Sequence, residues 1–149
     1  MKSLAREDYR AEIVRRLRTV RTDSIPRWGR MSAHQMVCHL ADACRMATGQ
    51  KAVAPVPGAL PPRVMKWIAL YSPLPWPRGI PTVPELDQHL GGTTPLEFAA
   101  DRAEVEALLN SLVSQETWPP HPMFGRMSRA DWLRWGYVHT AHHLRQFGA

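Results

Sequence analysis

Apolar side chains recur at helical spacing near the start of the chain. Between residues 4 and 21 they follow one another at intervals of four, four and three residues: Tyr9, Ile13, Leu17 and Val20. This spacing gathers the side chains on one face of an α-helix. The pattern therefore predicts a first helix from about Leu4 to Arg21.

Two further helices are predicted from the signals at their ends. Ser32 and Gln35 form a Ser-x-x-Gln capping box, and apolar residues continue from it towards a glycine at position 49. Ser128, with Asp131 three residues later, marks a second start, and the pattern runs on towards a glycine at position 148. His39 falls in the middle of the earlier helix. The later helix carries three histidines: His139, His142 and His143.

A fourth long helix is predicted between these two. Thr94 has the properties of an N-cap, Pro95 suits the first turn, and Glu97 can complete a capping box. An apolar stripe then continues to about Val113.

The stretch from Ala52 to Pro95 has 44 residues and holds ten of the fourteen prolines, so it cannot be one regular element. Within it, residues 61–72 (PPRVMKWIALYS) predict a short helix with prolines in its first turn. Its apolar set is Val64, Trp67, Ile68 and Tyr71. Because a structureless loop of this length is unusual, we expect the stretch to be a packed cover or a lid.

No strand alternation persists and no internal repeat is present, so the chain is expected to be all-α. The predicted architecture is a four-helix bundle with a long proline-rich crossover that contains the short helix. A length of 149 residues suits a single domain over residues 1–149. The hydrophobic fraction of 44% with 21% charged residues is typical of a globular protein and argues against wholesale disorder.

No stretch approaches the roughly 20 apolar residues of a membrane span, and the N-terminus lacks the apolar core of a secretory signal. We therefore expect a cytoplasmic protein with no membrane association. Cys38 and Cys44 lie six residues apart on one predicted helix, which is too far for a disulfide.

The chain is basic, with 19 Lys and Arg against 13 Asp and Glu. Nine of the basic residues lie among the first thirty residues, where they could attract nucleic acid or an anionic metabolite. They are, however, interleaved with Glu7, Asp8 and Glu12 at helical spacing, as on a solvated helix face. With no arginine run and no nucleic-acid motif, the solvated face is the preferred interpretation.

Histidines form the candidate site. His139 and His143 are four residues apart and project from one helix face, and His39 can join them if its helix is a neighbour. Three imidazoles suit zinc, nickel, iron or copper and leave a coordination position for water or substrate. The HxxxH spacing alone is a weak signal, because exposed or hydrogen-bonded histidine pairs share it.

Two blocks of sequence strengthen this interpretation: WGRMSAHQMVCHLADA (28–43) and HPMFGRMSRADWLRWGYVHTAHHLRQFG (121–148). They resemble the DinB/YfiT-like superfamily, in particular a mostly uncharacterised subgroup with a C-terminal HxxHHxxQFG motif. The resemblance covers the bundle from end to end and is loose only in the proline-rich middle. It implies a four-helix bundle that holds a divalent metal, zinc or nickel by expectation, through His39, His139 and His143.

Three residues beside these ligands have two interpretations each. His142 lies about 100° around the helix from His143, so it either hydrogen-bonds to a substrate or to a metal ligand, or is a surface or inter-helix histidine, which we prefer. Gln35 can orient His39 or only cap Ser32. Gln146 can face the site or anchor the C-terminus.

The remaining candidates are assigned to structure. Cys38 points about 100° away from His39 and is expected to be a buried thiol. Core packing explains Trp67, Trp132 and Trp135 as well as a pocket does. Three histidines have no partner that the sequence identifies: His34, His89 and His121.

Characterised relatives in the superfamily include metal-dependent thiol transferases and a thiol-dependent isomerase. The resemblance therefore implies a low-molecular-weight thiol that is activated by the metal and attacks a small electrophile, with no general acid or base assigned. The alternative is a non-catalytic metal-containing stress or small-molecule-binding protein. Bundles of this superfamily often pair, so a homodimer is also expected.

Overall fold

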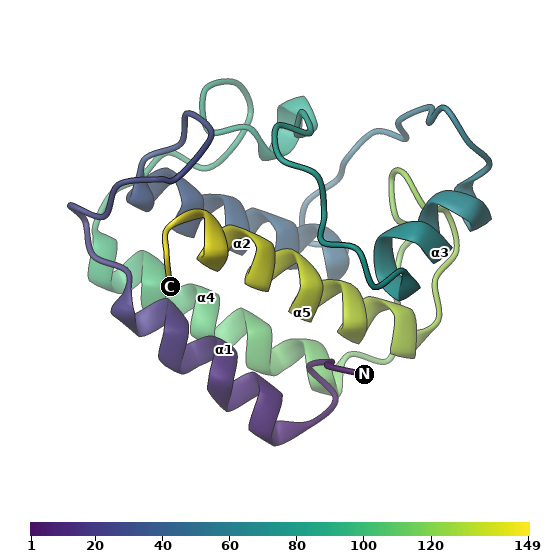
Figure 1. The fold of residues 1–149 in the computed structure, drawn as a ribbon, viewed down its shortest axis with the longest axis horizontal. Coiled ribbons are helices and arrows are strands. Elements are labelled where there is room, and N and C mark those ends of the chain that lie inside the picture. The colour runs from purple at the N-terminus through teal and green to yellow at the C-terminus, as the bar shows by residue number, and fades with distance from the viewer.

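Five α-helices and two short 3-10 turns form the regular structure of the computed structural model, which describes residues 1–149 (Figure 1). The α-helices are α1 (Glu7–Thr19), α2 (Ala33–Ala47), α3 (Pro62–Tyr71), α4 (Phe98–Ser111) and α5 (Arg129–Gln146). The 3-10 turns are η1 (Pro84–Leu86) and η2 (Leu112–Ser114). No strand is present, which confirms the all-α prediction. None of the helices combines the length and the apolar character needed to cross a bilayer.

The four long helices lie side by side, and α3 sits at one end of them (Figure 1). Helix α2 packs against α4 and α5, and α1 packs against the same two helices from the other side. Helix α3 packs mainly against α5. The two histidine-bearing helices, α2 and α5, are therefore neighbours.

Both predicted capping boxes are present and fix where these two helices begin. Ser32 Oγ accepts from the Gln35 backbone N–H, and Gln35 Oε1 accepts in return from the Ser32 N–H. Ser128 and Asp131 exchange the same pair of bonds at the start of α5. Fixed starts also fix which face of each helix carries its histidines.

The predicted start of α4 is wrong. Thr94 is not the N-cap; the cap is Glu97, whose carboxylate accepts from the N–H groups of Ala99 and Ala100. The side chain of Glu97 thus satisfies two free N–H groups of the first turn by itself, and the helix begins at Phe98 rather than within the Thr94-Pro95 step.

One continuous core of 26 buried residues joins all four long helices. It includes Leu4, which precedes α1 and is held by a bond from its N–H to the Leu133 carbonyl at 3.0 Å. A Cβ at Gly136 would lie 2.6 Å from Leu4 Cδ1. The missing side chain at Gly136 is therefore what lets the N-terminal segment pack onto α5.

The short helix in the crossover is confirmed, but the burial expected for it is not. Val64, Trp67 and Ile68 are 44%, 61% and 43% exposed, and the only fully buried residue of α3 is Leu70. The core assignment of Trp67 is wrong, because α3 packs mainly against α5 and its outer face, which carries Trp67, stays exposed. Trp132 and Trp135 are buried, as predicted.

Candidate metal centre

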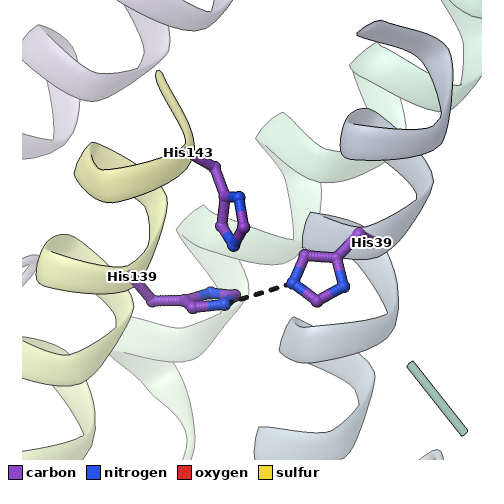
Figure 2. A group of neighbouring side chains, drawn as sticks. All are labelled: His39, His139 and His143. Carbon is purple, nitrogen blue, oxygen red and sulfur yellow. Dashed lines mark hydrogen bonds between the residues drawn. The ribbon is translucent and has the colours of Figure 1, made fainter. Parts of the chain in front are cut away.

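Three imidazoles from two helices converge in the interior of the bundle (Figure 2). His39 projects from α2, and His139 and His143 project from successive turns of α5. One ring nitrogen from each lies within 4.8 Å of the others. The Nε2 atoms of His39 and His139 are 3.3 Å apart.

The hydrogen bonds of two rings determine which nitrogen is free. His39 Nδ1 is 2.8 Å from the Leu86 carbonyl oxygen, and His143 Nδ1 is 2.9 Å from Gln146 Oε1. Both oxygens can only accept, so the two Nδ1 atoms carry the protons and the two Nε2 atoms keep their lone pairs. His39 Nε2 then accepts from the Nε2–H of His139. A metal ion would take the place of that proton.

Gln146 is oriented by a partner of its own. Its Nε2 donates to the Trp28 carbonyl at 2.7 Å, which turns its amide oxygen towards His143. The backbone carbonyl of Gln146 also accepts a hydrogen bond from the backbone N–H of Arg27. Gln146 therefore has both predicted roles. It contacts a site histidine, and it anchors the C-terminal helix to the segment before α2.

Burial keeps the three rings neutral. Burial lowers the pKa of His39, which is 3% exposed, below the ordinary value of 6.5. The pKa values of His139 and His143 are lowered further, first by burial and then by the charge that a neighbouring histidine would carry. Neutral imidazoles at pH 7 are the form that binds a metal.

The geometry and the donor set fit a divalent metal. Two imidazole nitrogens, each about 2.0 to 2.1 Å from one tetrahedral zinc ion, would lie about 3.3 to 3.4 Å apart. The separation of the His39 and His139 Nε2 atoms is 3.3 Å. Three nitrogen donors suit zinc or nickel and leave at least one position open.

The histidines line a cavity of about 770 Å³. Most of the other side chains that face it are apolar or aromatic and include Trp28, Met46, Met65, Ile68, Trp76, Leu86, Phe124 and Trp135. Trp135 stacks on the His139 ring at 4.9 Å with an interplanar angle of 8°, so it also holds that ligand in place. A space of this size takes a small organic molecule.

A buried carboxylate that the sequence interpretation missed supports the His39 side of the site. Asp42 is fully buried and accepts from the backbone N–H and hydroxyl of Thr93. Lys51 and Arg45 pair with the same carboxylate. These bonds hold the segment that contains η1 against α2 and so position the Leu86 carbonyl that orients His39.

The remaining predicted site residues lie as follows. His142 is half-buried between Trp28 and Trp76, with ring centroids 5.8 and 5.9 Å away, and lines the cavity without joining the three ligands. Gln35 is not brought to the site, because its side chain is engaged in the capping box and His39 is bonded to Leu86 instead.

The structure shows where the three histidines lie for which the sequence identified no partner: His34, His89 and His121. His34 Nε2 lies 2.6 Å from Asp101 Oδ2, and the same oxygen accepts from the thiol of Cys38, which is buried as predicted. His121 Nδ1 accepts from two N–H groups of its own turn, and its ring lines the cavity. His89 lines the cavity and is exposed. No short-range signal marks the Asp101 contact, because 67 residues separate it from His34.

Comparison with protein families gives one match. The model of DUF1569, described as a protein family of unknown function, matches residues 2–149. No curated protein and no solved structure matches the chain. DUF1569 is a DinB-like family, which agrees with the resemblance of the two motif blocks at the level of the superfamily. Because the match spans almost the whole sequence, the chain belongs to the DUF1569 family.

Proposed function

We propose that this protein binds one divalent metal ion, zinc or nickel, through His39, His139 and His143, and uses it to transfer a low-molecular-weight thiol to a small electrophile. The observation that carries the proposal is the convergence of these three neutral imidazoles, of which His39 is buried, on the wall of a large apolar cavity. A purely structural ion would need no such space beside it.

The chain supplies three ligands that line the cavity, so an ion held by them would have a position open to a molecule in the cavity. A bound ion would lower the pKa of a thiol placed there and keep it as the thiolate at neutral pH. The protein's own contribution is orientation and exclusion of water. The Leu86 carbonyl and Gln146 hold two of the ligands, and Trp135 covers the third.

We assign no general acid or base in the cavity, although other titratable side chains besides the ligands line it: Asp87, His89, His121 and His142. Burial, followed by the charge of Arg145, lowers the pKa of His142 to about 4, so this ring is neutral at pH 7. Burial lowers the pKa of His121 to about 4 as well. The proposed reaction therefore depends on the ion and on positioning, and the apolar lining favours an apolar electrophile.

The C-terminal motif HxxHHxxQFG supports membership of the DinB-like subgroup named above. Its first and third histidines are the ligands on α5, its second is His142, and its glutamine is Gln146. Each of these four positions contacts the site or its cavity. We propose that this motif marks the metal site of the subgroup.

The alternative is a non-catalytic protein in which the ion braces the bundle or holds a small molecule. The near-complete burial of His39 and its link to η1 favour some structural contribution from the site. The two functions differ in one respect: the proposed transferase must admit a small thiol to the ion, whereas the non-catalytic protein need not.

Cobalt substitution tests this difference. We expect the cobalt-loaded protein to develop a thiolate-to-metal absorption band when a small thiol such as 2-mercaptoethanol is added, and the zinc-loaded protein to accelerate thiol addition to an electrophile panel. His143→Ala should abolish both signals, whereas His89→Ala, which removes an exposed cavity histidine, should retain them. Metal loading without either signal would support the non-catalytic alternative.

A further inference from the structure

A second hollow of about 310 Å³ lies beside the metal cavity. Trp28, Trp76 and His142 line both spaces, so they form the boundary between them. The other residues that line the second hollow are one proline, Pro75, and three arginines: Arg27, Arg78 and Arg145. We call this hollow the arginine pocket. It contains no aspartate or glutamate.

The three arginines come from three separate segments, and none of them forms an ion pair or a side-chain hydrogen bond. Other exposed arginines of this protein do find carboxylates: Arg6 pairs with Asp8, Arg18 with Glu106 and Arg21 with Asp23. Arg27, Arg78 and Arg145 are thus three guanidinium groups without a carboxylate partner that gather around one hollow.

Contacts with neighbouring groups place these side chains. The Arg78 guanidinium lies 4.6 Å from the centre of the Trp28 ring, a cation-π contact at the boundary of the two spaces. The Arg27 guanidinium lies over Gly148, so close that a Cβ there would be 2.8 Å from Nη2. Arg145 follows His142 by three residues on α5, which puts the two side chains on adjacent turns of one face.

Three cations that face one space repel one another unless an anion joins them. The planar guanidinium fork binds carboxylate and phosphate oxygens in pairs, and such charge-assisted bonds are stronger than neutral ones. Because the two spaces adjoin at Trp28, Trp76 and His142, a chain-like molecule that passes this boundary would extend from the arginine pocket towards the metal-site histidines.

We propose that the arginine pocket binds the carboxylate of the same small thiol whose sulfur reaches the metal centre. The inference rests on the proposed function and narrows it, because it assigns the thiol to the class of carboxylate-bearing thiols. Arg27, Arg78 and Arg145 hold the acid, His142 and the two tryptophans flank the connecting chain, and the open position of the ion faces the sulfur.

The test compares matched thiols on cobalt-loaded protein. The probes are 3-mercaptopropionate, 6-mercaptohexanoate and 8-mercaptooctanoate. Each is compared with the mercaptoalcohol of the same length. The preference for the acid is the ratio of the two dissociation constants, taken at the chain length where this ratio is largest. We expect the acid to bind roughly tenfold more tightly than its alcohol. Arg27→Gln, Arg78→Gln and Arg145→Gln should each reduce that preference at least threefold. Arg15→Gln, at an exposed arginine outside both spaces, should leave it unchanged.

The outcomes separate this inference from the proposed function. Equal binding of acid and alcohol at every length, or a preference that survives all three substitutions, would overturn the arginine pocket while leaving the metal-thiol chemistry intact. If no thiol reaches the cobalt, the proposed thiol chemistry fails. Calorimetric titration of the metal-free protein with octanoate then tests separately whether the arginine pocket binds a carboxylate. Arginine-dependent octanoate binding would then support it, and no binding would refute it.

Discussion

At the scale of single residues, Gln146 carries the clearest prediction. Its amide oxygen accepts from His143 Nδ1 and so keeps the Nε2 lone pair of that ring available. Gln146→Leu removes this acceptor, and loss of such an outer partner lowers metal affinity by roughly 10- to 100-fold. Competition with a chromogenic chelator measures the change.

Gln35→Leu is the matched control for Gln146→Leu. Gln35 belongs to the capping box of α2, so its loss should cost about 1 kcal/mol of stability and leave metal affinity unchanged. Equal losses of affinity in the two variants would show that the effect is general loosening of the fold and not the orientation of His143.

The buried histidines also predict how stability depends on pH. Burial lowers the pKa of His139 and His143 in the folded protein, whereas the unfolded chain has ordinary values near 6.5. Below about pH 6.5 the unfolded chain therefore binds protons that the folded chain does not, and stability falls with falling pH. Each such histidine contributes a slope of up to about 1.4 kcal/mol per pH unit.

Urea unfolding of the metal-free protein between pH 7 and pH 5 measures this slope. His143→Gln should reduce it, and His89→Gln, at an exposed position, should not. An unchanged slope in His143→Gln would mean that His143 titrates at its ordinary pKa and lies open to water.

Residue identities in the candidate site could be proposed from the sequence because two ligands share a helix and a third sits in a recognisable motif. The partners that orient them could not. Asp42, Thr93 and Leu86 meet through a loop whose path no local pattern specifies, and 47 residues separate His39 from Leu86. Long-range contacts of this kind follow from packing and not from spacing.

At the scale of elements, Asp131 joins α3 to α5. Its carboxylate accepts from the Lys66 ammonium at 2.9 Å and from the Tyr71 hydroxyl, both on α3, as well as closing the capping box of α5. Burial alone would raise the pKa of Asp131, but the bonds from Tyr71, Ser128 and Lys66 outweigh it and lower the pKa to about 2.

The folded pKa of Asp131 lies below its unfolded value of about 3.9, so the carboxylate stabilises the fold above about pH 4, and this contribution is lost as the pH falls towards 2. Asp131→Asn should therefore cost roughly 2 to 3 kcal/mol at pH 7 and little near pH 2. Chemical unfolding at several pH values tests this. The exposed Asp8→Asn variant is the control, and a similar loss there would contradict a specific role for the α3 contact.

Helix existence could be predicted from the sequence more reliably than helix ends or helix faces. Both predicted Ser-based capping boxes mark observed helix starts. At α4 the N-cap is Glu97 and not the predicted Thr94, because the longer side chain of Glu97 satisfies two N–H groups directly. Trp67 lies on an apolar helix face that is exposed in the fold. The sequence could not predict this exposure, because periodicity shows which residues share a face and not what covers that face.

At the scale of the whole molecule, the make-up of the core predicts that the fold needs no ion. The 26 core residues link all four long helices, and the three ligands lie at the edge of a cavity and not at the centre of the packing. Chelated protein should therefore keep its helical circular dichroism, while added zinc raises the thermal midpoint. At a free zinc concentration 1,000 times Kd the gain would be about 4 kcal/mol. Loss of helix on chelation would instead favour an ion that braces the bundle.

The proposed centre requires three imidazoles that share one ion, and metal content per chain measures this most directly. Elemental analysis of protein loaded with zinc and passed over a desalting column should give one ion per chain for the wild type. His39→Ala, His139→Ala and His143→Ala should each give far less than one, with helical content retained, and His89→Ala should match the wild type. Undiminished metal in any of the three ligand variants, or none in the wild type, would contradict the proposed centre.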